Sequence, residues 1–239
     1  MNAHAASADG PCEVIPVIDL MDGLVVHAHL GDRAHYRPIR SKLCGSARIE
    51  DVVSALLGLH RFERLYIADI DALLGRARQL SAIDTVRRIA PALSLWIDAG
   101  IRDDHDLAAI AERGTPVLAT ETLTAQAAER LFAACPRAVL SVDYRGERLL
   151  GEAALLERLS RGPSDVIAMD LARVGSGAGP DLTHIAALRR VWPGSRLYAA
   201  GGVRDALDLR RSCEAGAAGV LVASALHDGR IQRSDLTAT

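Results

Sequence analysis

The chain contains 239 residues, of which 49% are hydrophobic and 24% are charged. This apolar share is sufficient to bury one large core, so we expect a single folded domain. The formal net charge of −2 excludes a general attraction to nucleic acid or to an acidic membrane surface. No stretch approaches the roughly 18 uninterrupted apolar residues of a membrane-spanning helix. We therefore predict neither a nucleic-acid partner nor a membrane partner.

The four cysteines are far apart in the sequence and form neither a CxxC pair nor the spacing of a zinc site. They are Cys12, Cys44, Cys135 and Cys213. We predict no metal site and no disulfide scaffold, which favours a reduced, cytoplasmic protein. The N-terminal stretch lacks the basic start and the apolar run of a signal peptide. We interpret residues 1–12 as a flexible tail and residues 13–239 as the folded domain.

Short β-rich runs alternate with amphipathic stretches along the chain, which is typical of parallel strands joined by crossover helices. In chain order, the predicted strands are 14–19, 64–69, 94–98, 116–120, 138–143, 165–170, 196–200 and 218–222. Each is separated from the next by a helix-sized segment or a long loop. Eight such units in a chain of this length predict an α/β fold with a single (β/α)8 TIM barrel.

Two segments of the chain repeat each other. Residues 96–103 read WIDAGIRD and residues 198–205 read YAAGGVRD, so each residue of the second copy lies 102 positions after its counterpart. The similarity continues through the following helix, where Gly114 matches Gly216. Both copies read as a strand, a glycine turn and the start of a helix. A repeated βαβ unit predicts that the barrel consists of two halves related by a twofold axis.

Five of the eight predicted strands end on aspartate. A carboxylate at the end of a buried strand lies at the C-terminal rim, where barrel enzymes have their active sites. Strands one and five are diametrically opposite, so Asp19 and Asp143 are expected to face each other across the barrel mouth as an acid–base pair. Asp103 and Asp205 instead follow glycine turns and precede helices, so we assign them to helix N-caps.

Glycine turns after the strands indicate two phosphate-binding loops, one in each half of the barrel. Backbone N–H groups and helix dipoles after strands seven and eight form the usual phosphate site of such barrels. A tight turn alone explains either glycine loop, but the recurrence of both loops at one spacing favours anion binding. The second-half cradle is predicted to consist of Gly201, Gly202, Ala223 and Ser224, and the first-half cradle of Gly100, Ile101, Arg102 and Thr120.

Several short motifs are shared with a known family. The sequences VIPVIDLMDGLVV at 14–26, DIDA at 69–72, GIR at 100–102, AGGV at 200–203 and GRI at 229–231 together resemble the HisA/HisF family of histidine-biosynthesis barrels. The resemblance covers nearly the whole chain after Pro11. It implies either an aldose–ketose isomerase acting on a ribotide with two phosphates (HisA type) or a cyclase that takes ammonia from a glutaminase partner (HisF type). The stretch DIDALLGR and the closing GRI favour the isomerase.

The resemblance implies roles for the two aspartates. Asp19 matches the strand-one aspartate, the expected general base that takes the C2 proton, and Asp143 matches the strand-five aspartate. Ring opening needs a proton at the ring oxygen and enol formation needs one removed from C2. Two carboxyl groups can perform both transfers without a metal or redox cofactor. We therefore expect a phosphorylated small molecule as substrate and no cofactor.

The chain departs from the family pattern in the loop after strand six. HisA-type members carry Arg-Asp-Gly-Thr there, whereas residues 173–176 read Arg-Val-Gly-Ser, so Val174 replaces a carboxylate often assigned as general acid. Three hypotheses follow. The chain is a HisA-type isomerase whose acid is Asp143, with Asp170; or a paralogue acting on another phosphorylated metabolite, for example in a methanopterin-type one-carbon cofactor pathway; or a non-catalytic phospho-ligand binding protein. The retained Asp19 and Asp143 favour an enzyme.

The loop after strand one is rich in histidine and arginine. Residues 26–38 read VHAHLGDRAHYRP, and Arg40 and Lys42 follow soon after. A basic loop beside a barrel mouth is either a lid over an anionic substrate or a solvated surface loop.

Overall fold

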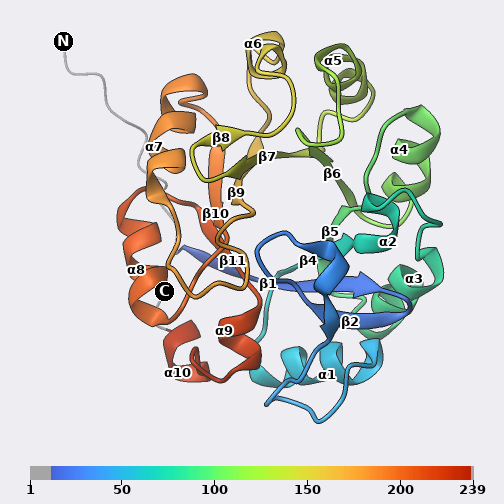
Figure 1. The fold of residues 1–239 in the computed structure, drawn as a ribbon, viewed down its shortest axis with the longest axis vertical. Coiled ribbons are helices and arrows are strands. Elements are labelled where there is room, and N and C mark those ends of the chain that lie inside the picture. The colour runs from blue at the N-terminus through green and yellow to red at the C-terminus, as the bar shows by residue number, and fades with distance from the viewer. Residues whose placement is uncertain (1–11, 238–239) are drawn as a thin grey trace.

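The computed structural model describes residues 12–237, so the expected tail lies outside the described residues except for Cys12. Eight parallel strands form a closed barrel, because β1 pairs both with β4 and with β11 (Figure 1). The predicted (β/α)8 barrel is confirmed, and the predicted strands match the observed ones to within a few residues. The barrel strands are β1 Glu13–Met21, β4 Arg64–Asp69, β5 Ser94–Asp98, β6 Thr115–Ala119, β7 Val139–Arg145, β9 Asp165–Asp170, β10 Arg196–Ala200 and β11 Gly219–Val222.

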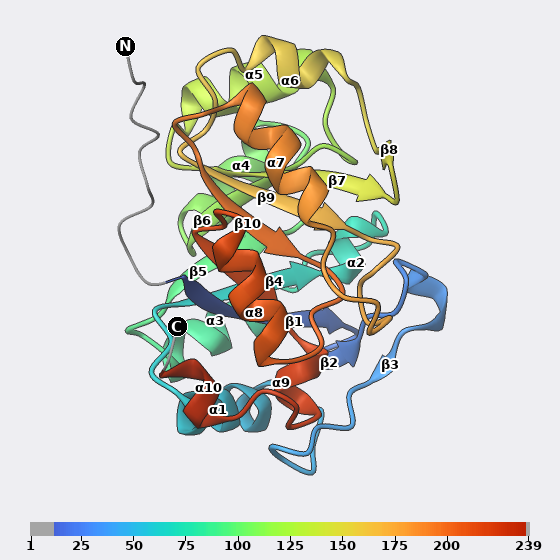
Figure 2. The same ribbon diagram turned by 90° about the vertical axis from the view of Figure 1, so that its left-hand side faces the viewer.

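Three short strands extend the barrel at its C-terminal rim. β2 (Leu24–His27) pairs antiparallel with β1 and with β3 (Arg37–Pro38), and β8 (Arg148–Leu149) pairs antiparallel with β7. Figure 2 shows β2, β3, β8 and the short helix α2 along one edge of the molecule. This edge is formed by the loops that follow the barrel strands, and it contains the functional region described below.

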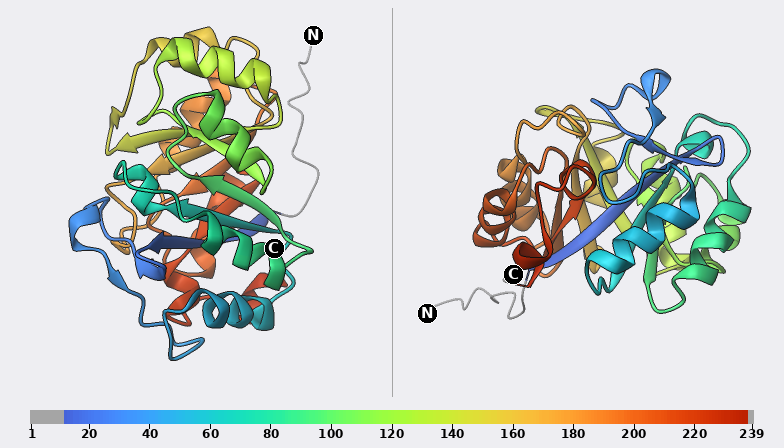
Figure 3. Two further views of the ribbon diagram at one scale, coloured as in Figure 1. Left: turned by 90° about the vertical axis from the view of Figure 1, so that its right-hand side faces the viewer. Right: turned by 90° about the horizontal axis from the view of Figure 1, so that it is seen from below.

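Helices surround the barrel strands (Figures 1 and 3). They are α1 Ile49–Leu59, α2 Ile70–Leu73, α3 Leu80–Ile89, α4 Asp104–Ala111, α5 Ala125–Ala134, α6 Ala154–Arg158, α7 Leu182–Val191, α8 Ala206–Glu214, α9 Ser224–His227 and α10 Arg233–Leu236, with a 3-10 turn at Arg33–His35. Among the described residues, no helix combines the length and the apolar character needed to cross a membrane.

The strands are nearly continuous apolar runs because both of their faces are buried. One face packs against the surrounding helices, through residues such as Ile67 and Leu140. The other face fills the barrel interior, where Trp96 and Tyr198 meet edge to face with ring centroids 4.8 Å apart. These two residues are counterparts in the sequence repeat, so the twofold relation read from the sequence places equivalent side chains against each other in the core.

The repeat also fixes how two of the helices begin. Asp103 and Asp205 are the N-caps of α4 and α8, where their carboxylates accept backbone N–H groups of the first turn. The predicted N-caps are therefore confirmed. The residue before each N-cap makes an equivalent hydrogen bond as well. The Arg102 amide donates to Asp106, and the Arg204 amide donates to the counterpart Asp208.

One prediction from the cysteines is wrong. A disulfide joins Cys12, at the start of β1, to Cys213 on α8, with a Cα–Cα distance of 5.6 Å and a sequence separation of 201 residues. Sequence spacing could not indicate this bond, because barrel closure alone brings the first strand beside the last βα unit. Cys12 is consequently part of the folded domain rather than of a tail. Cys44 and Cys135 are free.

The disulfide is expected to contribute measurably to thermal stability. Cross-links that close long loops typically stabilise a protein by about 2–4 kcal/mol, so Cys12→Ser should lower Tm by roughly 5–10 °C. Differential scanning calorimetry under non-reducing conditions measures this difference, with Cys44→Ser as the control that leaves the bond intact. Titration of the unfolded, unreduced protein should find two free thiols, and four would contradict the bond.

Candidate active site

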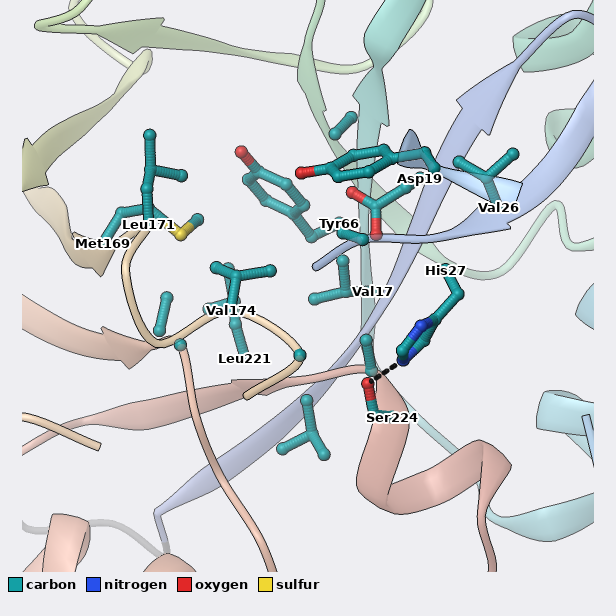
Figure 4. Close-up of a pocket in the computed structure, with 18 of the residues that line it drawn as sticks. Val17, Asp19, Val26, His27, Tyr66, Met169, Leu171, Val174, Leu221 and Ser224 are labelled. Atoms are coloured by element: carbon teal, nitrogen blue, oxygen red, sulfur yellow. Dashed lines mark hydrogen bonds between the residues drawn. The ribbon is translucent and has the colours of Figure 1, made fainter. Parts of the chain in front are cut away.

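A pocket opens at the C-terminal ends of the barrel strands (Figure 4). Its walls come from strands in both halves of the barrel and from the loops that follow them. Asp19 on β1 and Asp143 on β7 both line it, and these two strands lie opposite each other in the closed sheet. The structure thus brings the two predicted catalytic aspartates to a single cavity. Neither residue forms a salt bridge within residues 12–237.

Asp19 is half-buried near the end of β1, where β2 folds back on the strand. Figure 4 shows its carboxylate next to Tyr66 and within the pocket. Burial raises the pKa of Asp19 to about 7; the nearby charge of Arg33 opposes this rise and that of Asp98 adds to it. A carboxyl group with this pKa is partly ionised at neutral pH, which suits a general base.

Asp143 is held firmly on the opposite strand. Its Oδ1 accepts the Ser141 hydroxyl at 2.6 Å, and its Oδ2 accepts the Thr120 hydroxyl and the Glu121 amide, each at 3.2 Å. Burial and the charge of Glu121 raise the pKa of Asp143 to about 8, although the Ser141 hydrogen bond lowers it. At neutral pH Asp143 is therefore mostly protonated while Asp19 is partly ionised. The pocket holds one proton donor and one proton acceptor.

Two further acids line the pocket that the sequence reasoning did not select. Asp98 ends β5, accepts the Tyr66 hydroxyl at 3.2 Å and has its pKa raised to about 6 by burial and by the charge of Glu121. The pattern of strand-terminal aspartates could have indicated this residue. Glu121 lies in the loop after β6 and forms an ion pair with Arg33. No sequence pattern pointed to that pair, because it joins loops that are 88 residues apart.

The second-half cradle opens on the pocket. Gly201, Gly202, Ala223 and Ser224 all line it, and the backbone amides of these residues donate to no other atom of residues 12–237. Both glycines have positive φ angles, +102° and +84°. A Cβ on Gly201 would lie 2.5 Å from the carbonyl oxygen of Asp170 at the end of β9, and a Cβ on Gly202 would lie 2.5 Å from that of Gly179 in the loop after β9. The backbone therefore takes this conformation only with glycine. His27 Nε2 lies 3.0 Å from Ser224 Oγ at the edge of the cradle.

The predicted first-half cradle lies beside the pocket, but its residues do not line it. Gly100, Ile101, Arg102 and Thr120 are absent from the pocket walls. The Gly100 amide donates to Asp98 at 3.3 Å, and the Thr120 hydroxyl donates to Asp143. Carboxylates of the protein itself thus accept two of the cradle's donors, which turn geometry alone does not reveal, and phosphate binding at these four residues stays a prediction.

Asp170, the third predicted catalytic residue, is bound to its own loop and does not line the pocket. It is only 2% exposed and lies outside the pocket walls. Its carboxylate accepts the amides of Gly146 and Ala172 and pairs with Arg173 at 3.2 Å. Arg173 in turn donates to the Gly179 carbonyl at 3.0 Å. Asp170 therefore organises the loop that packs behind the second-half cradle.

The loop after β1 lies across the pocket mouth. The Leu30 amide donates to the Val174 carbonyl at 2.8 Å, which joins this loop to the loop after β9. Arg33 and Tyr36 line the pocket, and Arg33 reaches Glu121 after β6. These contacts support the lid interpretation over that of a solvated surface loop.

Apolar side chains form one wall of the pocket. Met169, Leu171, Val174 and Leu221 form this wall (Figure 4). Val174, which stands where the family pattern has a carboxylate, is one of its members. The loop after β9 therefore supplies no acid to the pocket.

Two groups of side chains within residues 12–237 come close enough to hold a metal ion, but both already have partners. In the group that contains Asp170 and Asp181, Arg173 donates to both carboxylates. In the group that contains Asp103 and Asp106, both carboxylates accept backbone amides next to the start of α4. Neither group lines the pocket. The groups are Asp170 with Asp181 and His184, and Asp103 with His105 and Asp106.

Comparison with known proteins agrees with this geometry. Residues 13–232 match the family model described as histidine biosynthesis protein. The chain belongs to this family. The match spans the barrel from β1 to the residues after β11, so the resemblance read from the motifs is confirmed over nearly the whole chain.

The relatives include named enzymes and an uncharacterised protein. A 1-(5-phosphoribosyl)-5-((5-phosphoribosylamino)methylideneamino)imidazole-4-carboxamide isomerase of Thermus thermophilus is 29% identical over 92% of this chain and 96% of its own length. The isomerase of the same name in Cenarchaeum symbiosum is 28% identical over 92% and 96%. An uncharacterised protein of Methanocaldococcus jannaschii is 28% identical over 94% of this chain and 97% of its own.

The raised pKa of Asp19 predicts a pH-dependent cost to stability. Because the folded-state pKa is about 7 and the ordinary value 3.8, this group favours the folded state below about pH 4, and that contribution is lost as the pH rises through 7. Asp19→Asn cannot ionise, so its Tm should exceed that of the wild type above pH 7 by roughly 2–4 °C or more. The difference should vanish near pH 4.

Calorimetry at pH 4 and pH 8 measures this effect. Asp22→Asn is the matched control, since Asp22 is an exposed aspartate directly after the same strand. Equal Tm differences at the two pH values would contradict the raised pKa.

Proposed function

We propose that this protein is an intramolecular aldose–ketose isomerase of the HisA type that acts on a phosphorylated sugar or ribotide. One observation supports this above all: Asp19 and Asp143 line the same pocket from opposite strands, with pKa values near 7 and 8. Carboxyl groups with different proton affinities around neutral pH suit simultaneous acid and base catalysis. The named relatives are isomerases, which supports the same reaction type.

The proton transfers follow from the protonation states. Protonated Asp143 gives its proton to the ring oxygen of the bound sugar as the bond from C1 to that oxygen breaks, while the lone pair of the other heteroatom on C1 forms a double bond to C1. Ionised Asp19 removes the proton from C2 to give the enol, and it returns this proton to C1 while the C2 hydroxyl loses its proton to Asp143, which gives the ketose. The reaction is redox-neutral overall, and it leaves Asp19 ionised and Asp143 protonated, as at the start. This assignment needs no acid at Val174, because Asp143 fills that role.

The phosphate of the substrate is assigned to the second-half cradle. Free backbone amides after the seventh and eighth barrel strands are the recurrent phosphate site of this fold. Gly201 and Gly202 supply amides that no other described group accepts. Binding there would hold the sugar between the two aspartates, while the loop after β1 excludes water.

Solvent-proton exchange tests the proposed reaction. Incubation in D2O with a panel of aldose phosphates and phosphoribosylamines should give, for at least one compound, a ketose product with deuterium at C1 and recovered substrate with deuterium at C2, both detected by NMR. Asp19→Asn and Asp143→Asn should each lower kcat roughly 10²–10⁴-fold, the usual contribution of general acid–base catalysis. Asp22→Asn should not.

A different result would identify a binding protein. If phosphate compounds bind to wild type and Asp19→Asn with equal affinity and none of them exchanges a proton, the protein is no isomerase.

The pH profile of kcat/KM should be bell-shaped. Activity should rise as Asp19 ionises through about pH 7 and fall as Asp143 loses its proton above about pH 8. Steady-state kinetics between pH 5.5 and about 9.5 measure both limbs. Asp98→Asn removes a neighbouring charge that raises the pKa of both aspartates, so it should move both limbs to lower pH. A flat profile across this range would contradict the assignment.

A further inference from the structure

The two cradles occupy equivalent places in the repeat but differ in whether their amides are free. In the first half, the Gly100 amide donates to Asp98 at 3.3 Å and the Glu121 amide donates to Asp143 at 3.2 Å. The Thr122 amide donates to the Ala119 carbonyl at 3.1 Å. Each of these amides already has an acceptor within the protein.

The counterparts in the second half have no such acceptors. Gly202, Ala223 and Ser224 lie 102 positions after Gly100, Glu121 and Thr122, and their amides donate to no atom of residues 12–237. At these three positions the second half therefore offers an external anion unused donors, whereas the first half does not.

The halves also differ in two side chains, and one of these, Asp98, accepts the Gly100 amide. Asp98 stands where the second half has Ala200, and Glu121 stands where it has Ala223. Both acids line the pocket, so side-chain carboxylates occupy the end of the cavity at which a second anion would bind.

The basic residue near this end does not offset the negative charge. Arg33 is the guanidinium that reaches it, and Arg33 forms an ion pair with Glu121. With Arg33 paired to Glu121, Asp98 is the unpaired carboxylate that faces a ligand, because Asp143 is mostly protonated at neutral pH. An anion placed there would meet like charges in a poorly solvated site.

We propose that the pocket selects a ligand with a single phosphate, bound at Gly201, Gly202, Ala223 and Ser224, and that Asp98 and Glu121 exclude a second anionic group from the opposite end. The far end of the ligand is a hydrogen-bond donor without negative charge, since carboxylates line that end. This inference rests on the proposed function, because it takes the second-half cradle as the phosphate site. It separates this chain from the named relatives, whose names specify two phosphoribosyl groups.

Counting bound anions tests the inference. Equilibrium dialysis with labelled inorganic phosphate should find one ion per wild-type chain, and crystals soaked in tungstate should show it at Gly202. The double variant Asp98→Ala/Glu121→Ala gives the first half the residues of the second, and it should bind two ions. Glu129→Ala/Glu157→Ala removes the same charge from exposed positions on α5 and α6, and it should still bind one.

A milder variant guards against misfolding of the double variant. Glu121→Gln keeps the size of the side chain and removes its charge, and it should bind a second phosphate at least tenfold more tightly than wild type. Each variant must also retain the ion at Gly202, which reports that the barrel is intact.

The possible failures are distinguishable. Two ions on the wild-type chain would overturn the single-phosphate inference and leave the isomerase proposal in place. A second experiment expresses the wild-type protein in a host that lacks the histidine-pathway isomerase, whose substrate carries two phosphates. We expect the host to remain a histidine auxotroph, and restored growth without histidine would likewise overturn the single-phosphate inference and leave the isomerase proposal in place. A single ion on both charge-removing variants would overturn the role of Asp98 and Glu121. Absence of any ion at Gly202 would overturn the phosphate assignment on which both proposals depend.

Discussion

The pairing of β1 with β11 is the constraint on which the rest of the structure depends. It closes the parallel sheet, so that all eight strands point their C-terminal ends at one cavity. Closure places Asp19 opposite Asp143, although 124 residues separate them in the sequence. It also brings Cys12 beside Cys213. Without this pairing the chain would have the same elements but no shared pocket.

The pocket concentrates carboxyl groups where water is scarce. Ionising a buried carboxyl group costs free energy, so the pKa values of Asp19, Asp98 and Asp143 all rise. Hydrogen-bond donors and one guanidinium, that of Arg33, limit the rise. The result is a set of groups that exchange protons near neutral pH, at the expense of stability.

The barrel has two halves that repeat each other in sequence, but the halves differ in the side chains at the rim. In the barrel interior the two halves still place large aromatic side chains at equivalent positions, as in the contact of Trp96 with Tyr198. At the rim, where the side chains face a ligand, Asp98 and Glu121 break this equivalence. The halves therefore kept a common fold while their ends of the pocket acquired different chemistry.

The sequence by itself determined the barrel, its repeat, the helix caps at Asp103 and Asp205, and the aspartate pair. These features follow from local periodicity and from spacing, which a single sequence displays directly. The tertiary structure alone decided which donors were free. Gly100 and Gly202 look alike as turn glycines, yet only the fold shows that Asp98 already accepts the amide of Gly100. It likewise decided that Glu121 meets Arg33, because this contact joins two loops whose proximity depends on closure.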